Sequence, residues 1–169
     1  MNDNNIIYGI NGPVVTVKNT KDFSMMEMVY VGHSHLVGEI IGITDEYTTI
    51  QVYEETTGLK PGEPVIGTGS PMNITLGPGI MNNIFDGIER PLKAIEEESG
   101  AFIARGASVE SLDTSRLWDV TITVKIGDKL NPGDIYATCP ETTIIMHKCM
   151  LSPKLSGEVI DVKENGKYK

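Results

Sequence analysis

Three histidines and two cysteines are the residues of this chain whose side chains bind transition metals most readily. His33 and His35 lie two residues apart, so both imidazoles would point to one face of a strand, as a zinc site could use. His147 and Cys149 have the same spacing, and only folding could bring Cys139 to them. Neither group has a third ligand nearby in sequence. We therefore expect a polar turn at the two histidines, buried free thiols at the two cysteines, and no metal site.

Nucleotide chemistry would require a glycine-rich loop that ends in Gly-Lys-Ser or Gly-Lys-Thr before a helix. The only Gly-Lys pair is Gly166-Lys167, which Tyr168 follows and no glycine precedes at the required spacing. The segment 67–69 lacks the third glycine of a dinucleotide-binding fingerprint. No nucleophile, base and orienting group occur together at a recognisable spacing. We expect no catalytic, cofactor-binding or metal-ligating residue in this chain.

The first 72 residues contain short runs of β-branched and apolar residues separated by turn-forming residues. These runs predict six strands, at residues 6–8, 14–17, 27–31, 36–43, 48–53 and 64–67. Six short strands in so few residues favour a small closed barrel, because closure removes exposed strand edges.

The segment 73–109 has a helical period. Ile80, Ile84 and Ile88 recur every four residues and predict a short helix that begins near Pro78 and ends before Pro91. A second short helix is expected between Pro91 and Gly100, with the side chains of Leu92 and Ile95 directed inward. Helices this short need a partner surface.

The last part, residues 110–169, returns to β-type segments at 121–126, 135–138, 142–147 and 158–162. They predict a second small β-domain. The expected fold is therefore mainly β, with a barrel at 1–72, a short helical linker at 73–109 and a second β-domain at 110–169.

The net charge is −9, with 23 acidic against 14 basic side chains. This charge disfavours a nonspecific nucleic-acid binder and a basic membrane-surface protein. The chain has no signal-peptide pattern and no run of about 20 apolar residues, so we expect a cytoplasmic protein that does not insert into a membrane.

Several blocks of sequence identify a family resemblance. They are Gly9–Val15, Leu36–Ile41, Val52–Val65, Leu76–Ile80, Ile84–Leu92 and Ile145–Met150. In this order they resemble the start of the catalytic subunit, or alpha chain, of vacuolar (V-type) and archaeal-type (A-type) rotary ATPases. The resemblance spans essentially the whole chain.

The resemblance implies that the six-stranded barrel joins neighbouring catalytic and noncatalytic subunits, the A and B subunits of the head, into a ring. It also implies that residues 110–169 are the bulge, a barrel-sandwich-like insertion that meets the peripheral stalk. Residues 73–109 would be the first strip of the nucleotide-binding domain, whose phosphate loop and catalytic glutamate lie farther along the full-length protein.

The resemblance implies that the full-length catalytic subunit binds Mg-ATP and couples its hydrolysis or synthesis to H⁺ or Na⁺ transport. The family's residues that bind and hydrolyse ATP have no matching positions in this chain. We expect this chain to be a piece of that protein, inactive alone and located in the cytoplasmic head, peripheral to the membrane. The apolar side chains of the linker would then lack the sheet that they cover, so we expect this segment to be mobile or to pack against another copy.

Two other interpretations remain open. Residues 131–135 and 151–160 look like the two halves of a biotinyl or lipoyl carrier domain, with Lys148 as the only lysine between them. Lys148 lacks the sequence setting of those carriers and lies close to the second half. The chain could also be a free-standing, noncatalytic assembly module whose acidic barrel contacts basic partner surfaces.

Overall fold

The computed structural model describes residues 5–18, 22–81, 83–100, 102–107 and 109–169. The chain folds into two compact units. Unit 1 contains Met1–Ile74 and Phe85–Val109, and unit 2 contains Thr75–Ile84 and Glu110–Lys169. Among the described residues, no helix is long and apolar enough to cross a membrane. The three-part division at 1–72, 73–109 and 110–169 stays a prediction.

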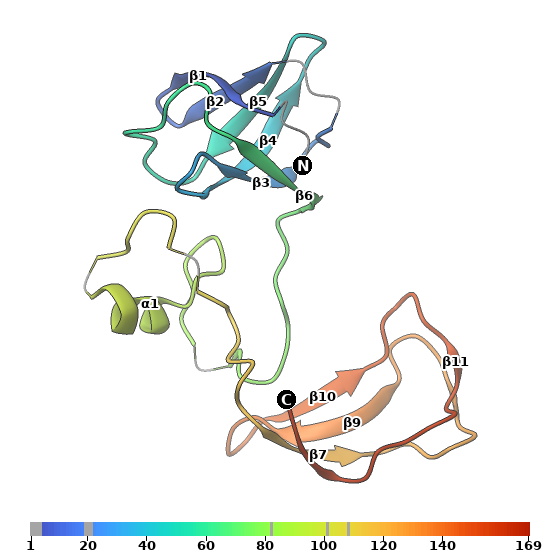
Figure 1. The fold of residues 1–169 in the computed structure, drawn as a ribbon. Helices are drawn as coiled ribbons and strands as arrows, with labels where there is room; N and C mark the ends of the chain where they lie inside the picture. Colours follow the sequence, from blue (N-terminus) through green and yellow to red (C-terminus); the bar gives the residue numbers. More distant parts are fainter. Residues whose placement is uncertain (1–4, 19–21, 82, 101, 108) are drawn as a thin grey trace. The chain divides into compact units, whose positions relative to one another are not determined.

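Unit 1 is built on one antiparallel sheet of six strands, with the order β1-β2-β5-β4-β3-β6 (Figure 1). The six expected strands are confirmed, at β1 Ile7–Asn11, β2 Val14–Lys18, β3 Glu27–Val31, β4 Leu36–Ile43, β5 Tyr47–Val52 and β6 Val65–Pro71. The two outer strands are joined where they begin, by a bridge between Ile6 and Pro64. Hydrogen bonds from the Ile7 N–H to the Glu63 carbonyl (2.8 Å) and from the Val65 N–H to the Asn5 carbonyl (2.7 Å) support this bridge.

The core of unit 1 follows from alternation along the strands. In β2, β3 and β5, every second side chain is buried, and most of these side chains are β-branched. The core side chains are Ile7, Val15, Val17, Phe23, Val29, Val31, Leu36, Ile40, Ile50, Val52, Leu59 and Val65. Burial of each valine, leucine or isoleucine side chain contributes about 1.5–3 kcal/mol, so the sheet holds most of the apolar stabilisation of the protein.

The single helix of the described residues, α1 Leu92–Ser99, also belongs to unit 1. It begins after Pro91 and ends at Gly100, whose N–H bonds to the Glu96 carbonyl and whose φ of 80° turns the chain out of the helix. Ile95 is 2% exposed. The expected helix between Pro91 and Gly100 is confirmed.

The helix expected to begin near Pro78 is wrong. The described residues from 78 to 90 form turns, and Phe85 pairs with Pro91 in an isolated bridge. The Asp86 carboxylate accepts hydrogen bonds from the N–H groups of Ile88 (3.1 Å) and Arg90 (2.9 Å), which closes a tight loop where a helix would need i to i+4 bonds. The expected apolar stripe is also divided, because Ile84 is 72% exposed while Ile95 is buried. Mobility of this segment, or its packing on another copy, stays a prediction.

Unit 2 contains the second small β-domain, which is confirmed. A four-stranded antiparallel sheet has the order β10-β9-β7-β12, and β11 pairs with β8. The strands are β7 Trp118–Ile122, β8 Lys129–Leu130, β9 Ile135–Pro140, β10 Met146–Met150, β11 Gly157–Glu158 and β12 Gly166–Tyr168.

Three strand boundaries in unit 2 differ from expectation. The first strand begins at Trp118 and ends at Ile122 instead of spanning 121–126, and only two residues near 158–162 form a strand. The strand expected at 142–147 begins at Met146. The Thr142 hydroxyl accepts hydrogen bonds from the N–H groups of Ile144 (3.3 Å) and Ile145 (3.0 Å), so a side-chain turn occupies the start of that segment.

Candidate docking surfaces

The two nearby histidines lie in the turn between β3 and β4, and both are exposed. His35 has a φ of 51°, and the backbone N–H of His33 donates to the Glu63 carboxylate (3.1 Å). The expected polar turn is confirmed.

The two cysteines lie on neighbouring strands as free thiols. Cys139 is opposite His147 in the β9–β10 register, and Cys149 is two residues farther along β10. Burial is the main cause that raises the pKa of both thiols above 9.0. Cys139 is buried and Cys149 is half-buried, and no three metal-ligating side chains come together in the part of the chain that the structure describes.

Lys148 lies within β10, opposite Thr138 and away from the tip of the β9–β10 hairpin. A carrier domain presents its lysine at the tip of a tight hairpin, so that an enzyme can reach it from both sides. The position of Lys148 within a paired strand therefore disfavours cofactor attachment there.

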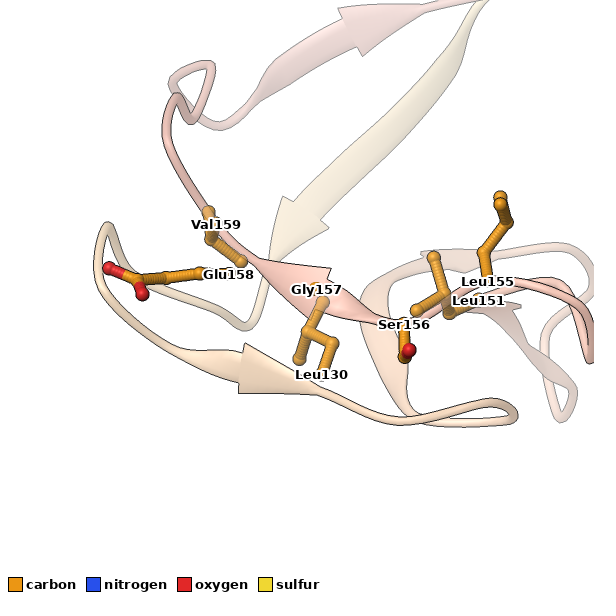
Figure 2. A pocket seen from close by; sticks show the side chains of 7 residues that line it. All are labelled: Leu130, Leu151, Leu155, Ser156, Gly157, Glu158 and Val159. Atoms are coloured by element: carbon orange, nitrogen blue, oxygen red, sulfur yellow. The ribbon is translucent and has the colours of Figure 1, made fainter.

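A groove with a volume of about 270 Å³ lies beside the β8–β11 pair of unit 2. Figure 2 shows the side chains that line it along this pair and the preceding loop. They are Leu130, Leu151, Leu155, Ser156, Gly157, Glu158 and Val159. A second hollow shares Leu130 and residues 156–158 and adds Lys129 and Asn131. We call the two hollows together the bulge groove.

The lining of the bulge groove is mainly apolar. Leu155 is 57% exposed, and the Glu158 carboxylate points away from the leucines (Figure 2). Gly157 adds no side chain, and a Cβ at this position would meet nothing within 4 Å. Partly exposed leucines around a hollow, with charges at its rim, are typical of a protein-binding surface.

Unit 1 has an aromatic cluster at its surface on strands β1, β2 and β5, in which Tyr8 is 52% exposed and Tyr47 is half-buried. The rings of Tyr8 and Tyr47 are 5.2 Å apart, and the Lys18 ammonium group lies 5.5 Å from the Tyr8 ring centre. A hydrogen bond with the Tyr8 side chain raises the pKa of Tyr47 above 10.0. Exposed tyrosines are common in the energetically important part of protein interfaces.

A half-buried charge cluster in unit 1 holds the loop after residue 85. The Arg90 guanidinium contacts Asp86 (Nε to Oδ2, 2.7 Å) and Glu54 (Nη1 to Oε2, 3.4 Å). Glu54 also accepts a hydrogen bond from the Gly106 N–H (3.0 Å). Burial alone would raise the pKa of Asp86, but hydrogen bonds from Arg90 and Ile88 lower it below 3.8.

Sequence reasoning missed one residue of unit 2, Glu141. Its side chain is 3% exposed, and its oxygens accept hydrogen bonds from backbone N–H groups of the segment 75–84 and contact His147. Burial would raise the pKa of Glu141, but these hydrogen bonds and His147 lower it below 4.5. A single glutamate after Pro140 gives no sequence signal for a partner that lies 60 residues away in the chain.

Comparisons with known proteins agree with this architecture. Residues 7–69 match the beta-barrel domain of the ATP synthase alpha/beta family, and residues 109–169 match the ATP synthase alpha/beta subunit barrel-sandwich domain. The V-type ATP synthase alpha chain of Halothermothrix orenii is 54% identical over 159 residues, which are 94% of this chain and 27% of that one. The A subunit of the A-type ATP synthase of Pyrococcus abyssi is 47% identical over 96% of this chain and 16% of its own length.

A solved structure of the assembled ATPase EscN, from the type III secretion system of enteropathogenic E. coli, aligns with 52% of this chain and 21% of its own. Its sequence identity is 22% and its TM-score is 0.47, which are too low to support an inference on function.

The chain belongs to the ATP synthase alpha/beta family and is similar to the N-terminal region of the catalytic subunit of V-type and A-type ATP synthases. It spans about a quarter of the length of the V-type relative. The family resemblance expected from the sequence blocks is confirmed.

Proposed function

We propose that this chain supplies ring assembly and peripheral-stalk attachment in a rotary ATPase that couples ATP hydrolysis or synthesis to H⁺ or Na⁺ transport. The observation that carries the proposal is the 54% identity to a V-type ATP synthase alpha chain over 94% of this chain. The full-length protein would bind Mg-ATP through residues beyond those present here. Its place would be the cytoplasmic head of the motor, peripheral to the membrane.

Ring assembly is assigned to unit 1, through contacts with neighbouring A and B subunits. The aromatic cluster of Tyr8, Lys18 and Tyr47 supports this assignment, because it presents two rings and a cation on the outer side of the sheet. Aromatic side chains lose little conformational entropy on binding and bury large areas.

Stalk attachment is assigned to the bulge groove of unit 2. The groove combines partly exposed leucines with charged residues at its rim, which suits the apolar face of an amphipathic helix from a stalk protein. The mixed charges of Lys129 and Glu158 would affect the rate and salt dependence of binding more than its strength.

The test is the affinity of the 169-residue chain for the purified peripheral-stalk proteins of the same motor, measured by isothermal titration calorimetry. Leu155→Asp should weaken binding at least tenfold, because it introduces a charge into the apolar groove. Leu117→Asp is the matched control, since Leu117 is 54% exposed against 57% for Leu155 and lies outside the groove. Equal affinities of wild type and the Leu155→Asp variant would contradict attachment through this groove.

A further inference from the structure

Glu141 joins three separate pieces of unit 2. It follows β9, and its Oε1 atom accepts hydrogen bonds from the N–H groups of Gly79 (2.8 Å) and Met81 (2.9 Å). Its Oε2 atom lies 3.3 Å from Nδ1 of His147 on β10. Hydrogen bonds to an ionised carboxylate are about twice as strong as those between neutral groups, and burial protects them from water.

Packing around the same point holds the segment 75–84 against the sheet. Trp118 at the start of β7 lies so close to Gly79 that a Cβ there would be 3.1 Å from the indole ring. Gly77 approaches Leu112 more closely still, with 2.8 Å from its ideal Cβ position to a leucine methyl group. A side chain at Gly79 would meet the indole ring and would also be strained by the φ of 105° there, whereas a side chain at Gly77 would require the end of Leu112 to shift.

The path of the chain determines what these contacts hold in place. The backbone passes from unit 1 to unit 2 between Ile74 and Thr75, returns between Ile84 and Phe85, and enters unit 2 again between Val109 and Glu110. The segment 75–84 has no regular strand or helix in its described residues, so the sheet does not hold it through a strand ladder.

We propose that the Glu141 carboxylate is a clamp that fixes the segment 75–84 to the β-domain of residues 110–169. With the clamp closed, three chain crossings attach this domain to unit 1. With the clamp open, the segment becomes a loose loop, and the crossing at Val109–Glu110 is left to hold the domain. The clamp would thereby restrict pivoting of the β-domain, whether or not a stalk protein is bound to it.

The test is amide hydrogen exchange, measured residue by residue by NMR in the 169-residue chain. Glu141→Gln keeps the shape of the side chain and removes its charge, so the Gly79 and Met81 amides should exchange at least tenfold faster. The amides of Thr123 and Ile122, which bond within unit 2 without Glu141, should keep their rates. Glu164→Gln, at an exposed glutamate with the same side chain, is the matched control and should change neither set.

Unchanged exchange at Gly79 and Met81 would overturn the proposal, and so would an equal acceleration throughout unit 2. A second measurement, made on the wild type, tests the proposal if the Glu141→Gln variant does not fold. Its Gly79 and Met81 amide proton shifts should titrate together, with one midpoint below 4.5 that matches the Glu141 carboxyl carbon. The other titratable groups that face this carboxyl are His147 on β10 and Cys139 on β9. Gly79 and Met81 amide shifts that do not change as Glu141 titrates would also overturn the proposal.

Discussion

Carboxylate side chains close many of the loops of this acidic protein. Each carboxylate of this group accepts a hydrogen bond from a backbone N–H group of its own loop or of a neighbouring loop. The group comprises Glu27, Glu54, Glu63, Asp86, Asp113, Asp128, Asp134 and Glu141. Part of the negative charge therefore stabilises loops inside the chain, and it is not evidence for a basic partner.

Asp86 gives this role a pH dependence. The folded protein holds the pKa of Asp86 below 3.8, so its contribution to stability is complete well above that pH and is lost as the pH falls through the lowered pKa. Asp86→Asn should therefore reduce the free energy of unfolding of unit 1 by about 1–2 kcal/mol at pH 7.

Urea unfolding followed by far-UV circular dichroism at pH 7 and at acidic pH measures this effect. The difference between wild type and Asp86→Asn should shrink in acid. Asp45→Asn, at an exposed aspartate of the β4–β5 turn, is the control. A difference that stays constant with pH would show that the charge of Asp86 is unimportant.

Gly106 is a second residue whose type is fixed by its surroundings. Its φ is 64°, and an added Cβ would overlap the carbonyl oxygen of Ser34. Gly106→Ala should therefore destabilise unit 1 by about 2 kcal/mol or more, from left-handed strain and from the overlap.

Gly12→Ala separates the two contributions. Gly12 has a φ of 58° and open space around its Cβ position, so strain alone should cost about 1 kcal/mol there. Differential scanning calorimetry of both variants makes the comparison. Equal losses in the two variants would mean that the loop at Gly106 moves to accept a methyl group.

At the scale of elements, the strands of unit 1 could be predicted because each satisfies a local rule. Residues 27–31 alternate between buried and half-buried positions, and β-branched residues fill most of the buried ones. The helix at 92–99 was equally accessible, because Pro91 and Gly100 mark its ends.

The element that was predicted wrongly is one in which a side chain competes with the backbone for hydrogen bonds. The four-residue spacing of Ile80, Ile84 and Ile88 suggested a helix, but the Asp86 carboxylate bonds the N–H groups that such a helix would use. The sequence does not show which polar groups will meet after folding. For the same reason Glu141 and the bulge groove, which depend on residues far apart in the chain, were not predicted.

The two cysteines of the β9–β10 pair allow a prediction about thiol reactivity. Burial raises the pKa of Cys139 and Cys149 above 9.0, so little thiolate is present near neutral pH. Both thiols should react slowly with iodoacetamide at about pH 7.5, and the half-buried Cys149 should be alkylated before Cys139, which is 1% exposed.

Peptide mass spectrometry over a time course gives the two rates. The same reaction in concentrated urea is the control, because both thiols should then react quickly and at equal rates. Faster alkylation of Cys139 in the native protein would contradict the arrangement of this strand pair.

At the scale of the whole molecule, the two units differ in how much apolar surface they bury. Unit 1 has a continuous core of 12 buried side chains, whereas the buried apolar residues of unit 2 are Trp118, Ala137 and Cys139 among its described residues. We expect unit 2 to unfold at a lower urea concentration than unit 1.

Trp118 is the single tryptophan of the sequence, and it lies in unit 2 with the Arg116 guanidinium 3.9 Å from its ring centre. Its fluorescence should therefore change at a lower urea midpoint than the amide exchange of Val29 and Val31, which are buried in β3. Coincident midpoints from the two probes would show instead that the chain unfolds as one cooperative unit.

The interleaved path of the backbone has a consequence for protein engineering. A chimera that exchanges residues 110–169 between two relatives would transfer Glu141 and Trp118 but leave behind the glycines at 77 and 79 that lie in the segment they contact. The transferable piece is discontinuous, because it consists of 75–84 together with 110–169. Grafts should therefore be joined at Ile74–Thr75, Ile84–Phe85 and Val109–Glu110. A graft joined only at Val109–Glu110 would pack Trp118 of one parent against the segment 75–84 of the other.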